Sequence, residues 1–177
     1  MLAGLPYDPA DAELAADRAR ARGLCRSLNA GAADASVVQR DLLPLAHPSA
    51  VVSAPFFCDY GYHIALSEGV YFNVNCVLLD ICMISVGANT LVGPGVHIYT
   101  VNHPLDVGRR RTGVEIGRPV TIGCDVWIGG ACVICPGVEI GDGTVVAAGS
   151  VVTRSLPPGV LAAGNPCRVV RAIDGAG

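Results

Sequence analysis

The residue best suited to chemistry in this chain is a histidine on an irregular segment. His103 lies in the stretch 99–118 and is followed by Pro104. A neutral imidazole can accept the proton of a hydroxyl group during nucleophilic attack, so we predict that His103 is a general base. Glu115, in the same stretch, is the candidate carboxylate for orienting the second ring nitrogen. A lone loop histidine is often not catalytic, so this role is a hypothesis.

The spacing of the histidines also bears on metal binding. His97 and His103 are six residues apart, which could align them on adjacent edges of a repeating structure. A zinc site needs three protein ligands, and neither His47 nor His63 stands at a matching spacing. We therefore predict no metal site, and we expect structural roles for His47 and His63.

Two of the eight cysteines form a C-x-x-C motif. In the repeat described below, Cys132 falls in an inward-facing column, whereas Cys135 lies just past an inward position. The two thiols should therefore point in different directions. This arrangement favours small buried apolar residues over a metal or redox pair.

The elements that must position these residues are indicated by a period of six over residues 120–153. One column of branched aliphatic side chains contains Ile122, Ile128, Ile134, Ile140, Val146 and Val152. Two residues before each lies a column of smaller side chains: Val120, Val126, Cys132, Val138, Thr144 and Ser150. A helix repeats at about 3.6 residues and a strand at about 2, so this period fits neither alone. It predicts short strands joined by fixed corners, the hexapeptide repeat of a parallel β-helix.

An earlier, less regular block of the repeat starts at about Ser49. Its inward column is Leu66, Phe72 and Leu78, and it resumes as Val86, Val92 and Ile98 after a slip of two residues at 80–82. Such a phase break is a bulge, and bulges often re-aim side chains near sites. Asn73, Asn75 and Asp80 lie around it, either as site residues or as caps of strand ends. The stretch 99–118 lacks the repeat, and a projecting excursion of about twenty residues is where function usually lies.

The sequence divides into three parts. Residues 1–48 are expected to form a helical cap, with a helix from roughly Pro9 to Leu28, Asp8 as its N-cap, and a second short helical stretch before His47. Residues 49–155 are expected to form the β-helix, with the excursion at about 99–119. Residues 156–177 are expected to form a proline-rich turn, a short basic strand or helix, and a frayed end. The predicted fold class is mainly β.

Composition argues against several functions. Hydrophobic residues at 51% and charged residues at 15% suit a solenoid whose flat faces are partly covered by other subunits. The net charge of −3 argues against nucleic acid as a partner, because phosphate binding requires a basic face. The N-terminus lacks the pattern of a signal peptide, and no segment approaches the ~18 uninterrupted apolar residues of a membrane span. We therefore expect a cytoplasmic protein.

Five segments together resemble a known family. They are YFNVNCVLLD, GPGVHIYTVNHPLD, PVTIGCDVWIGG, ICPGVEIGDG and AAGSVVTRSLPPGVLAAGNPCRVVR. The combination closely resembles the hexapeptide-repeat O-acetyltransferases, and most closely the maltose and galactoside acetyltransferases with the related nodulation acetyltransferases. The N-terminal MLAGLPYDP and its helix resemble the cap of that family, so the resemblance covers nearly the whole chain. It implies a left-handed β-helix.

The resemblance implies a homotrimer that transfers acetyl from acetyl-coenzyme A to a sugar hydroxyl, with active sites between neighbouring subunits. It assigns catalysis to His103, with Glu115 beside it. It assigns substrate binding to Asp8, Tyr71, Asn73 and Asp80. It assigns binding of acetyl-coenzyme A to Trp127, Gly130, Ala148, Thr153, Arg154, Arg168 and Arg171. Arg154 stands where lysine is common in the family, which keeps a positive charge near the phosphates.

Other functions stay open at this point. A metal-dependent enzyme of the γ-carbonic anhydrase type is disfavoured by the missing third histidine and would contain stoichiometric zinc. A non-catalytic subunit that binds sugar would never release free thiol from acetyl-coenzyme A. The acceptor could also be a non-sugar hydroxyl, as in the serine acetyltransferases, which resemble this chain less in the cap and loop. Direct transfer is preferred to a covalent cysteine route, because no cysteine lies beside His103 in sequence.

Overall fold

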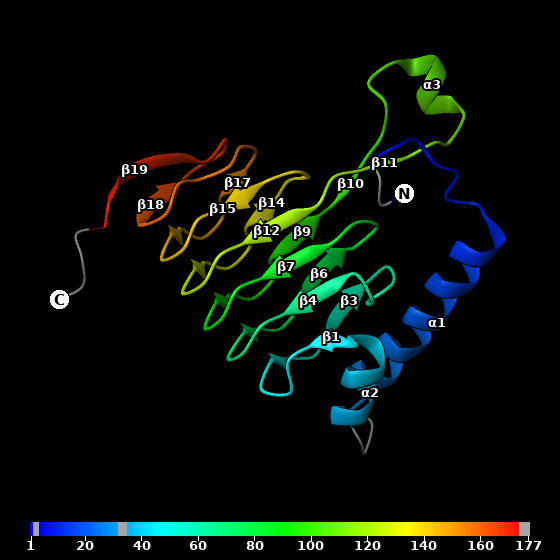
Figure 1. Ribbon diagram of the computed structural model, residues 1–177, viewed down its shortest axis with the longest axis horizontal. Helices are drawn as coiled ribbons and strands as arrows, with labels where there is room; N and C mark the ends of the chain where they lie inside the picture. The colour runs from blue at the N-terminus through cyan, green and yellow to red at the C-terminus, as the bar shows by residue number, and fades with distance from the viewer. Residues whose placement is uncertain (2–3, 32–34, 174–177) are drawn as a thin grey trace.

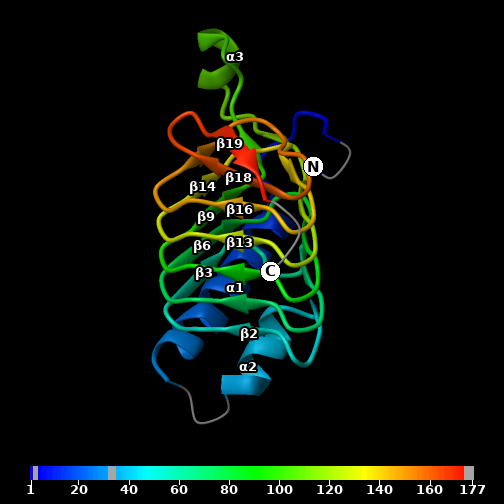
Figure 2. The same cartoon turned by 90° about the vertical axis from the view of Figure 1, so that its left-hand side faces the viewer.

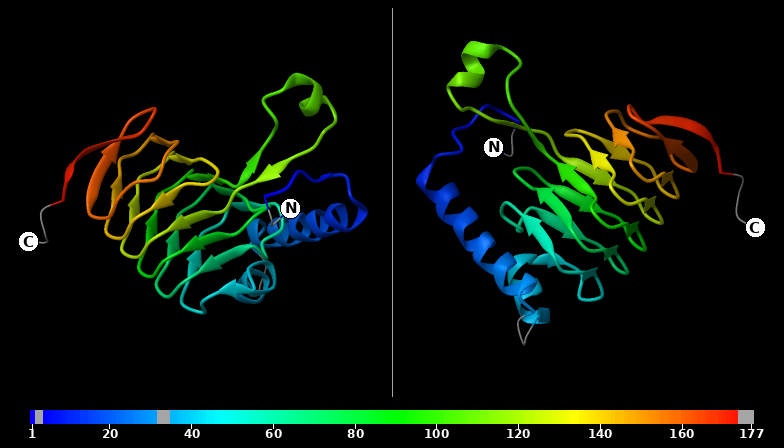
Figure 3. Two further views of the ribbon diagram at one scale, coloured as in Figure 1. Left: turned by 45° about the horizontal axis from the view of Figure 1, so that its top comes forward. Right: turned by 180° about the vertical axis from the view of Figure 1, so that it is seen from behind.

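The fold is built on coils of backbone that stack along one axis (Figure 1). The computed structural model describes residues 1, 4–31 and 35–173, so the frayed end expected at 174–177 lies outside the described residues. Two helices lie at one end of the stack, strand β19 lies at the other, and one excursion projects from its side (Figures 1 and 3). The chain is therefore a parallel β-helix with a helical cap, as the period of six predicts.

Three parallel sheets form the faces of the prism (Figure 2). The first face contains β1 (Leu45–Ala46), β4 (Ile64–Leu66), β7 (Ile84–Val86), β12 (Val120–Ile122) and β15 (Glu139–Ile140). The second contains β2 (Val51–Val52), β5 (Tyr71–Phe72), β8 (Leu91–Val92), β13 (Trp127–Ile128), β16 (Val145–Val146), β18 (Val160–Ala163) and the antiparallel end strand β19 (Arg168–Ala172). The third contains β3 (Phe56–Cys58), β6 (Cys76–Leu79), β9 (His97–Tyr99), β14 (Val133–Ile134) and β17 (Val151–Val152).

Each coil runs from the first face to the second and then to the third. We call the turn from the second face to the third the groove corner; it includes residues 129–132 of the fourth coil. We call the turn from the third face back to the first the loop corner; it includes residues 100–119, where the excursion leaves the coil. The positions of the site residues are given below relative to these two corners.

The core is the interior of the prism. The two columns predicted over 120–153 are buried there, and none of their residues is more than 2% exposed. Full burial of such an aliphatic side chain contributes roughly 1.5–3 kcal/mol to stability. Gly129 shows how tightly the coils stack, because a Cβ at this position would lie 2.5 Å from the backbone nitrogen of Ala148 in the next coil.

The cap consists of α1 (Ala12–Asn29) and α2 (Ala35–Leu42). The N-cap of α1 is Asp11 and not Asp8, because Oδ1 of Asp11 accepts hydrogen bonds from the Glu13 and Leu14 amides at 2.9 and 3.3 Å. Asp8 instead accepts the Ala10 amide at 2.8 Å in the turn before the helix. The helix α1 packs against β3 and covers the open end of the first coil.

The excursion has secondary structure of its own. Strands β10 (Val101–Asn102) and β11 (Ile116–Gly117) pair antiparallel at its base, and the short helix α3 (Val107–Arg111) forms its tip (Figures 1 and 3). Asp106 caps this helix, with Oδ1 accepting the Arg109 amide at 2.8 Å. Within the described part of the chain, neither these helices nor any other combines the length and apolar character that a membrane crossing requires.

Candidate active site

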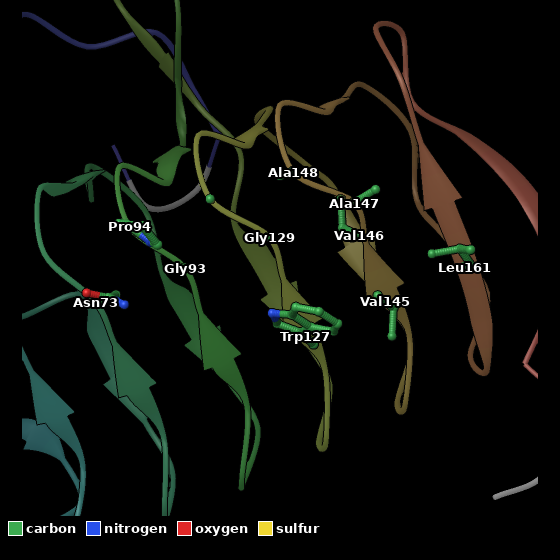
Figure 4. A pocket seen from close by; sticks show the side chains of 11 residues that line it. Asn73, Gly93, Pro94, Trp127, Gly129, Val145, Val146, Ala147, Ala148 and Leu161 are labelled. Atoms are coloured by element: carbon green, nitrogen blue, oxygen red, sulfur yellow. The ribbon is translucent and has the colours of Figure 1, made fainter.

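A groove runs along the groove corner of successive coils (Figure 4). It encloses about 530 Å³ and is lined by Asn73, Gly93, Pro94, Trp127, Gly129, Gly130, Val145, Val146, Ala147, Ala148 and Leu161. Four of the residues predicted to bind substrate or cofactor line this one groove: Asn73, Trp127, Gly130 and Ala148. These residues come from three different coils, so only the folded prism brings them together.

Strand alternation explains how Trp127 reaches the groove. Ile128 points into the core and is 0% exposed, so Trp127 must point outward, where it is 56% exposed. It pairs in register with Leu91 on one side and Val145 on the other. Its indole therefore lies in an apolar row on the second face, and Figure 4 shows Trp127 and Val145 projecting from neighbouring strands.

The apolar row ends at strand β19, which carries two arginines. Val145 pairs with Leu161, and Leu161 pairs with Arg171 of the end strand β19. Arg168 lies on the same strand, and both arginines are exposed. The predicted cofactor residues on β19 therefore lie at the end of the row that contains Trp127.

Tyr71 lies on the other side of the tryptophan along the same face. It pairs in register with Leu91, which in turn pairs with Trp127. Its hydroxyl accepts a hydrogen bond from Ser53 at 3.3 Å. Tyr71 is therefore part of the second face, two coils away from the indole.

His103 lies at the loop corner and is exposed. The backbone that follows it is held by Arg110, whose guanidinium donates to the carbonyl oxygens of Pro104 and Leu105 at 3.1 and 2.9 Å. The β10–β11 hairpin, the N-cap bond of Asp106 and the bonds of Arg110 together hold the segment that carries the imidazole.

Glu115 lies on the returning side of the excursion. The hairpin pairs Asn102 with Ile116, so His103 and Glu115 are the residues next to the last pair on the outgoing and returning strands. Among the hydrogen bonds of the described residues, the Glu115 carboxylate accepts the Tyr7 hydroxyl, and no bond joins it to His103. The orienting role of Glu115 therefore stays a prediction, and the phenol of Tyr7 is a partner that the sequence did not indicate.

Thr153 and Arg154 lie at the loop corner of the fifth coil, directly after β17, and both are exposed. Asp8 is exposed beside Tyr7, which bridges to the excursion. The structure therefore divides the predicted residues between two corners of the prism. The third face, roughly 15–20 Å wide for one extended hexapeptide, separates them within one chain.

Asp80 is fully buried in the phase break after β6. Its carboxylate accepts the backbone amides of Asp59 and Tyr60 at Oδ1, at 3.0 and 2.9 Å, and that of Gly61 at Oδ2, at 2.7 Å. Burial raises the pKa of Asp80 to about 7, against the opposing effect of these amide donors. This position fits a structural role in holding the first coil, rather than the substrate contact predicted from the sequence.

The remaining histidines and the C-x-x-C cysteines take part in local contacts. The Nδ1 atom of His63 lies 2.8 Å from the Asp80 carbonyl oxygen, and that of His97 lies 2.6 Å from the Tyr99 hydroxyl. Cys132 is buried in the core, whereas Cys135 is half-buried. Among residues 1, 4–31 and 35–173, no three His, Cys, Asp or Glu side chains are grouped so that they could hold a metal ion.

Several residues of the site were not predicted from the sequence. Pro94, Val145 and Leu161 line the groove, Arg110 holds the backbone after His103, and Tyr7 binds Glu115. The hexapeptide phase could have indicated Val145, because it lies one residue before an inward position, as Trp127 does. The contacts of Tyr7 and Arg110 depend on how the excursion folds.

Comparison with known proteins identifies the class. The family model "Maltose acetyltransferase hexapeptide capping motif" matches residues 1–43, and "Bacterial transferase hexapeptide (six repeats)" matches residues 119–154. Nodulation protein L of Rhizobium meliloti (strain 1021) is 46% identical over 173 residues, which cover 96% of this chain and 94% of that protein.

Solved structures agree with this result. A maltose O-acetyltransferase from Clostridium difficile 630 has a TM-score of 0.94 at 40% identity, covering 98% of this chain and 95% of that one. A hexapeptide-repeat-containing acetyltransferase from Vibrio cholerae O1 biovar eltor, complexed with acetyl coenzyme A, has a TM-score of 0.92 at 40% identity, covering 98% and 96%. The coils and cap are thus those of hexapeptide-repeat transferases. Within that class, this chain belongs to the acetyltransferases of the maltose acetyltransferase type.

Proposed function

We propose that this protein transfers the acetyl group of acetyl-coenzyme A to a hydroxyl group of a sugar, with His103 as the general base. The groove carries this proposal most directly, because it gathers Asn73, Trp127, Gly130 and Ala148 along one apolar wall. The similarity to a maltose O-acetyltransferase and to a protein that binds acetyl coenzyme A supports the same reaction class.

The groove suits a long, partly apolar thioester. Gly130 packs closely against the preceding coil, because a Cβ at this position would lie 3.0 Å from the Pro94 carbonyl oxygen, so this part of the groove wall is backbone without a side chain. The exposed indole of Trp127 offers a flat apolar surface for the pantetheine arm. Arg168 and Arg171, at the end of the row, would meet the phosphates, because guanidinium groups bind phosphate well.

The transfer needs one base and one leaving group. The imidazole of His103 removes the proton of the sugar hydroxyl while the oxygen attacks the thioester carbon, and a carbon–oxygen bond forms. Backbone amides of the tight coil turns are candidate donors to the oxyanion of the tetrahedral intermediate. The carbon–sulfur bond then breaks with its electron pair on sulfur, and the imidazolium returns the proton to give free coenzyme A thiol. No covalent enzyme intermediate is required.

A complete site needs two copies of the chain. His103 and the groove lie at different corners, so the groove corner of one copy would have to meet the loop corner of its neighbour. The exposed faces favour this arrangement, because the second and third faces expose Leu91 and Phe57, whereas the first face exposes Leu45 only in its end strand β1 and presents Thr121 and Glu139 further along. A cyclic homotrimer places the two corners together three times.

The direct test is thiol release from acetyl-coenzyme A over a panel of sugars. We expect sugar-dependent release by the wild type and a loss of about 10²–10⁴-fold in His103→Ala, because the base is removed. His47→Ala is the matched control, since His47 is an exposed histidine whose ring contacts only Ser49 among the bonds of the described residues. Undiminished release by His103→Ala would remove His103 from the mechanism, and no release with any sugar would contradict the proposed acceptor class.

A further inference from the structure

The N-terminal segment contacts the excursion through Tyr7. Tyr7 and Glu115 exchange both backbone hydrogen bonds, each with an N···O distance of 3.1 Å, and form an antiparallel bridge. The Tyr7 hydroxyl also donates to Oε2 of Glu115. Gly4 lies against the same strand, because a Cβ at this position would be 3.5 Å from the Gly117 carbonyl oxygen. The segment around Tyr7 therefore runs beside β11 at the base of the hairpin (Figures 1 and 3).

Two pairings connect Tyr7 and Glu115 to the hairpin that carries His103. The bridge sets Tyr7 opposite Glu115, which directly precedes β11, while His103 directly follows β10, the strand paired with β11. Directly opposed residues of antiparallel strands point to the same face of the sheet, with Cβ atoms about 4.5–5.5 Å apart. The Tyr7 phenol and the Glu115 carboxylate therefore share one face, next to the end of the strand that leads into the proposed base.

The segment that carries Tyr7 is attached to helix α1 and the first coil. Arg18 of α1 donates to the Pro9 carbonyl oxygen and, at 2.7 Å, to the Tyr60 hydroxyl. Tyr60 is 0% exposed, and its backbone amide is held by the buried Asp80. A chain of contacts thus runs from the core of the first coil through Arg18 to Pro9, two residues after Tyr7, while the excursion itself leaves the stack after the third coil.

The phenol is suited to act as a donor at this place. Burial, and then the hydrogen bond with Glu115, raise the pKa of Tyr7, so the phenol keeps its proton. A protonated phenol can donate to the carboxylate and restrict its position, whereas a phenylalanine of the same shape could not.

We propose that Tyr7 is a positioning residue for acetyl transfer, which holds Glu115, and through it His103, by the phenol–carboxylate hydrogen bond and the paired backbone of the excursion. This inference rests on the proposed function, in which His103 is the base. Tyr7 itself need not touch either substrate. The segment that precedes α1 then has a role of its own, because it holds the returning side of the excursion.

Tyr7→Phe tests the proposal, and the chain offers a matched control. Tyr62 also donates its hydroxyl to a carboxylate, that of Asp17 at 2.8 Å, and it too lies between the cap and the first coil. Tyr62→Phe removes the same chemical group from a hydrogen bond in which the excursion takes no part. We expect kcat to fall about 10-fold in Tyr7→Phe, with the KM for acetyl-coenzyme A unchanged, because misplacement of a catalytic group slows the chemical step. We expect Tyr62→Phe to stay within about twofold of wild type.

A double-mutant cycle separates positioning through Glu115 from a general effect on the fold. If Tyr7 acts through the carboxylate, the pair Tyr7→Phe and Glu115→Gln will be no slower than Glu115→Gln alone. Additive losses, or a Tyr7→Phe enzyme with wild-type kcat, would overturn the inference while leaving the proposed function intact. Wild-type turnover is measured first, because its absence with every acceptor would overturn the proposed function and the positioning role with it.

Discussion

Asp80 has a fully buried carboxylate that several backbone amides hold in place. The phase break turns this side chain inward, where its oxygens replace the hydrogen-bonding partners that Asp59, Tyr60 and Gly61 lack at the end of the first coil. Asp80 therefore stabilises the backbone around Tyr60, which in turn contacts the cap. Its effect on activity would be indirect.

The protonation of Asp80 predicts a pH-dependent stability. The folded pKa of about 7 lies above the ordinary value of 3.8, so between these pH values the folded chain binds more protons than the unfolded chain. The free energy of unfolding should therefore decrease as the pH rises through this window. We expect the stability of wild type relative to Asp80→Asn to fall by roughly 2–4 kcal/mol between pH 4 and pH 8.

Thermal unfolding across this pH range, at one protein concentration, would measure the difference. Asp41→Asn serves as the control, because it neutralises an exposed aspartate of the cap. A stability difference that instead grows with pH would show that the amide donors hold Asp80 as the anion, contrary to the expected sign.

Among the elements, the excursion combines a hairpin, a helix cap and two side-chain contacts. Arg110 bonds the carbonyl oxygens of Pro104 and Leu105 on the outgoing side, and Tyr7 bonds Glu115 on the returning side. One contact holds the backbone directly after His103, and the other holds the residue directly before β11. The segment that carries the proposed base is thus held by the excursion's own helix and by the segment that precedes α1.

Arg110→Met should slow the reaction by misplacing His103. It removes both hydrogen bonds to the carbonyls after His103, each worth about 0.5–1.5 kcal/mol, so we expect kcat to fall about 3–10-fold. The neighbouring change Arg111→Met removes an equal charge from α3, yet no Arg111 side-chain bond occurs among the described residues. Steady-state kinetics of the two variants would distinguish them, and equal losses in both would indicate an effect of charge rather than of loop geometry.

The sequence predicts the coils better than it predicts the excursion. The inward positions of each hexapeptide can be identified from its own residues, so a column such as Ile122, Ile128 and Ile134 can be recognised without knowing any distant contact. The partner of Glu115 is Tyr7, which lies 108 residues away, and no local pattern connects the two. The N-cap of α1 was misplaced because Asp8 and Asp11 both precede the helix, and only the hydrogen bonds decide between them.

The sequence predicts which residues belong to the candidate site, but it does not predict how they are arranged in space. The outward position of Trp127 follows from the coil phase, whereas Gly130 and Ala148 were predicted from the family resemblance, and the stacked coils bring all three to one groove. The burial of Asp80 could not be predicted, because its partners are amides of the preceding coil. The division of the site between two corners becomes visible only when the prism is assembled.

At the scale of the whole molecule, each chain of the proposed trimer contributes two separate parts of an active site, one at each corner. The groove corner offers an apolar groove at whose end the arginines of β19 lie, and the loop corner carries the proposed base together with the contacts of its segment. Each copy in a cyclic trimer would contribute a groove to one neighbour and a loop to the other. The exposed Trp127, Leu91 and Phe57 lie on the two faces that flank the groove corner.

Subunit complementation tests this shared site most directly. His103→Ala removes the base, and Ala148→Trp fills the groove at an exposed position on its wall. Each variant alone should be nearly inactive in thiol release. When equal amounts are unfolded and refolded together, about a quarter of the sites should pair an intact loop corner with an intact groove corner, and about a quarter of the wild-type activity should return. Activity no higher than the sum of the separately refolded variants would contradict a site formed between subunits.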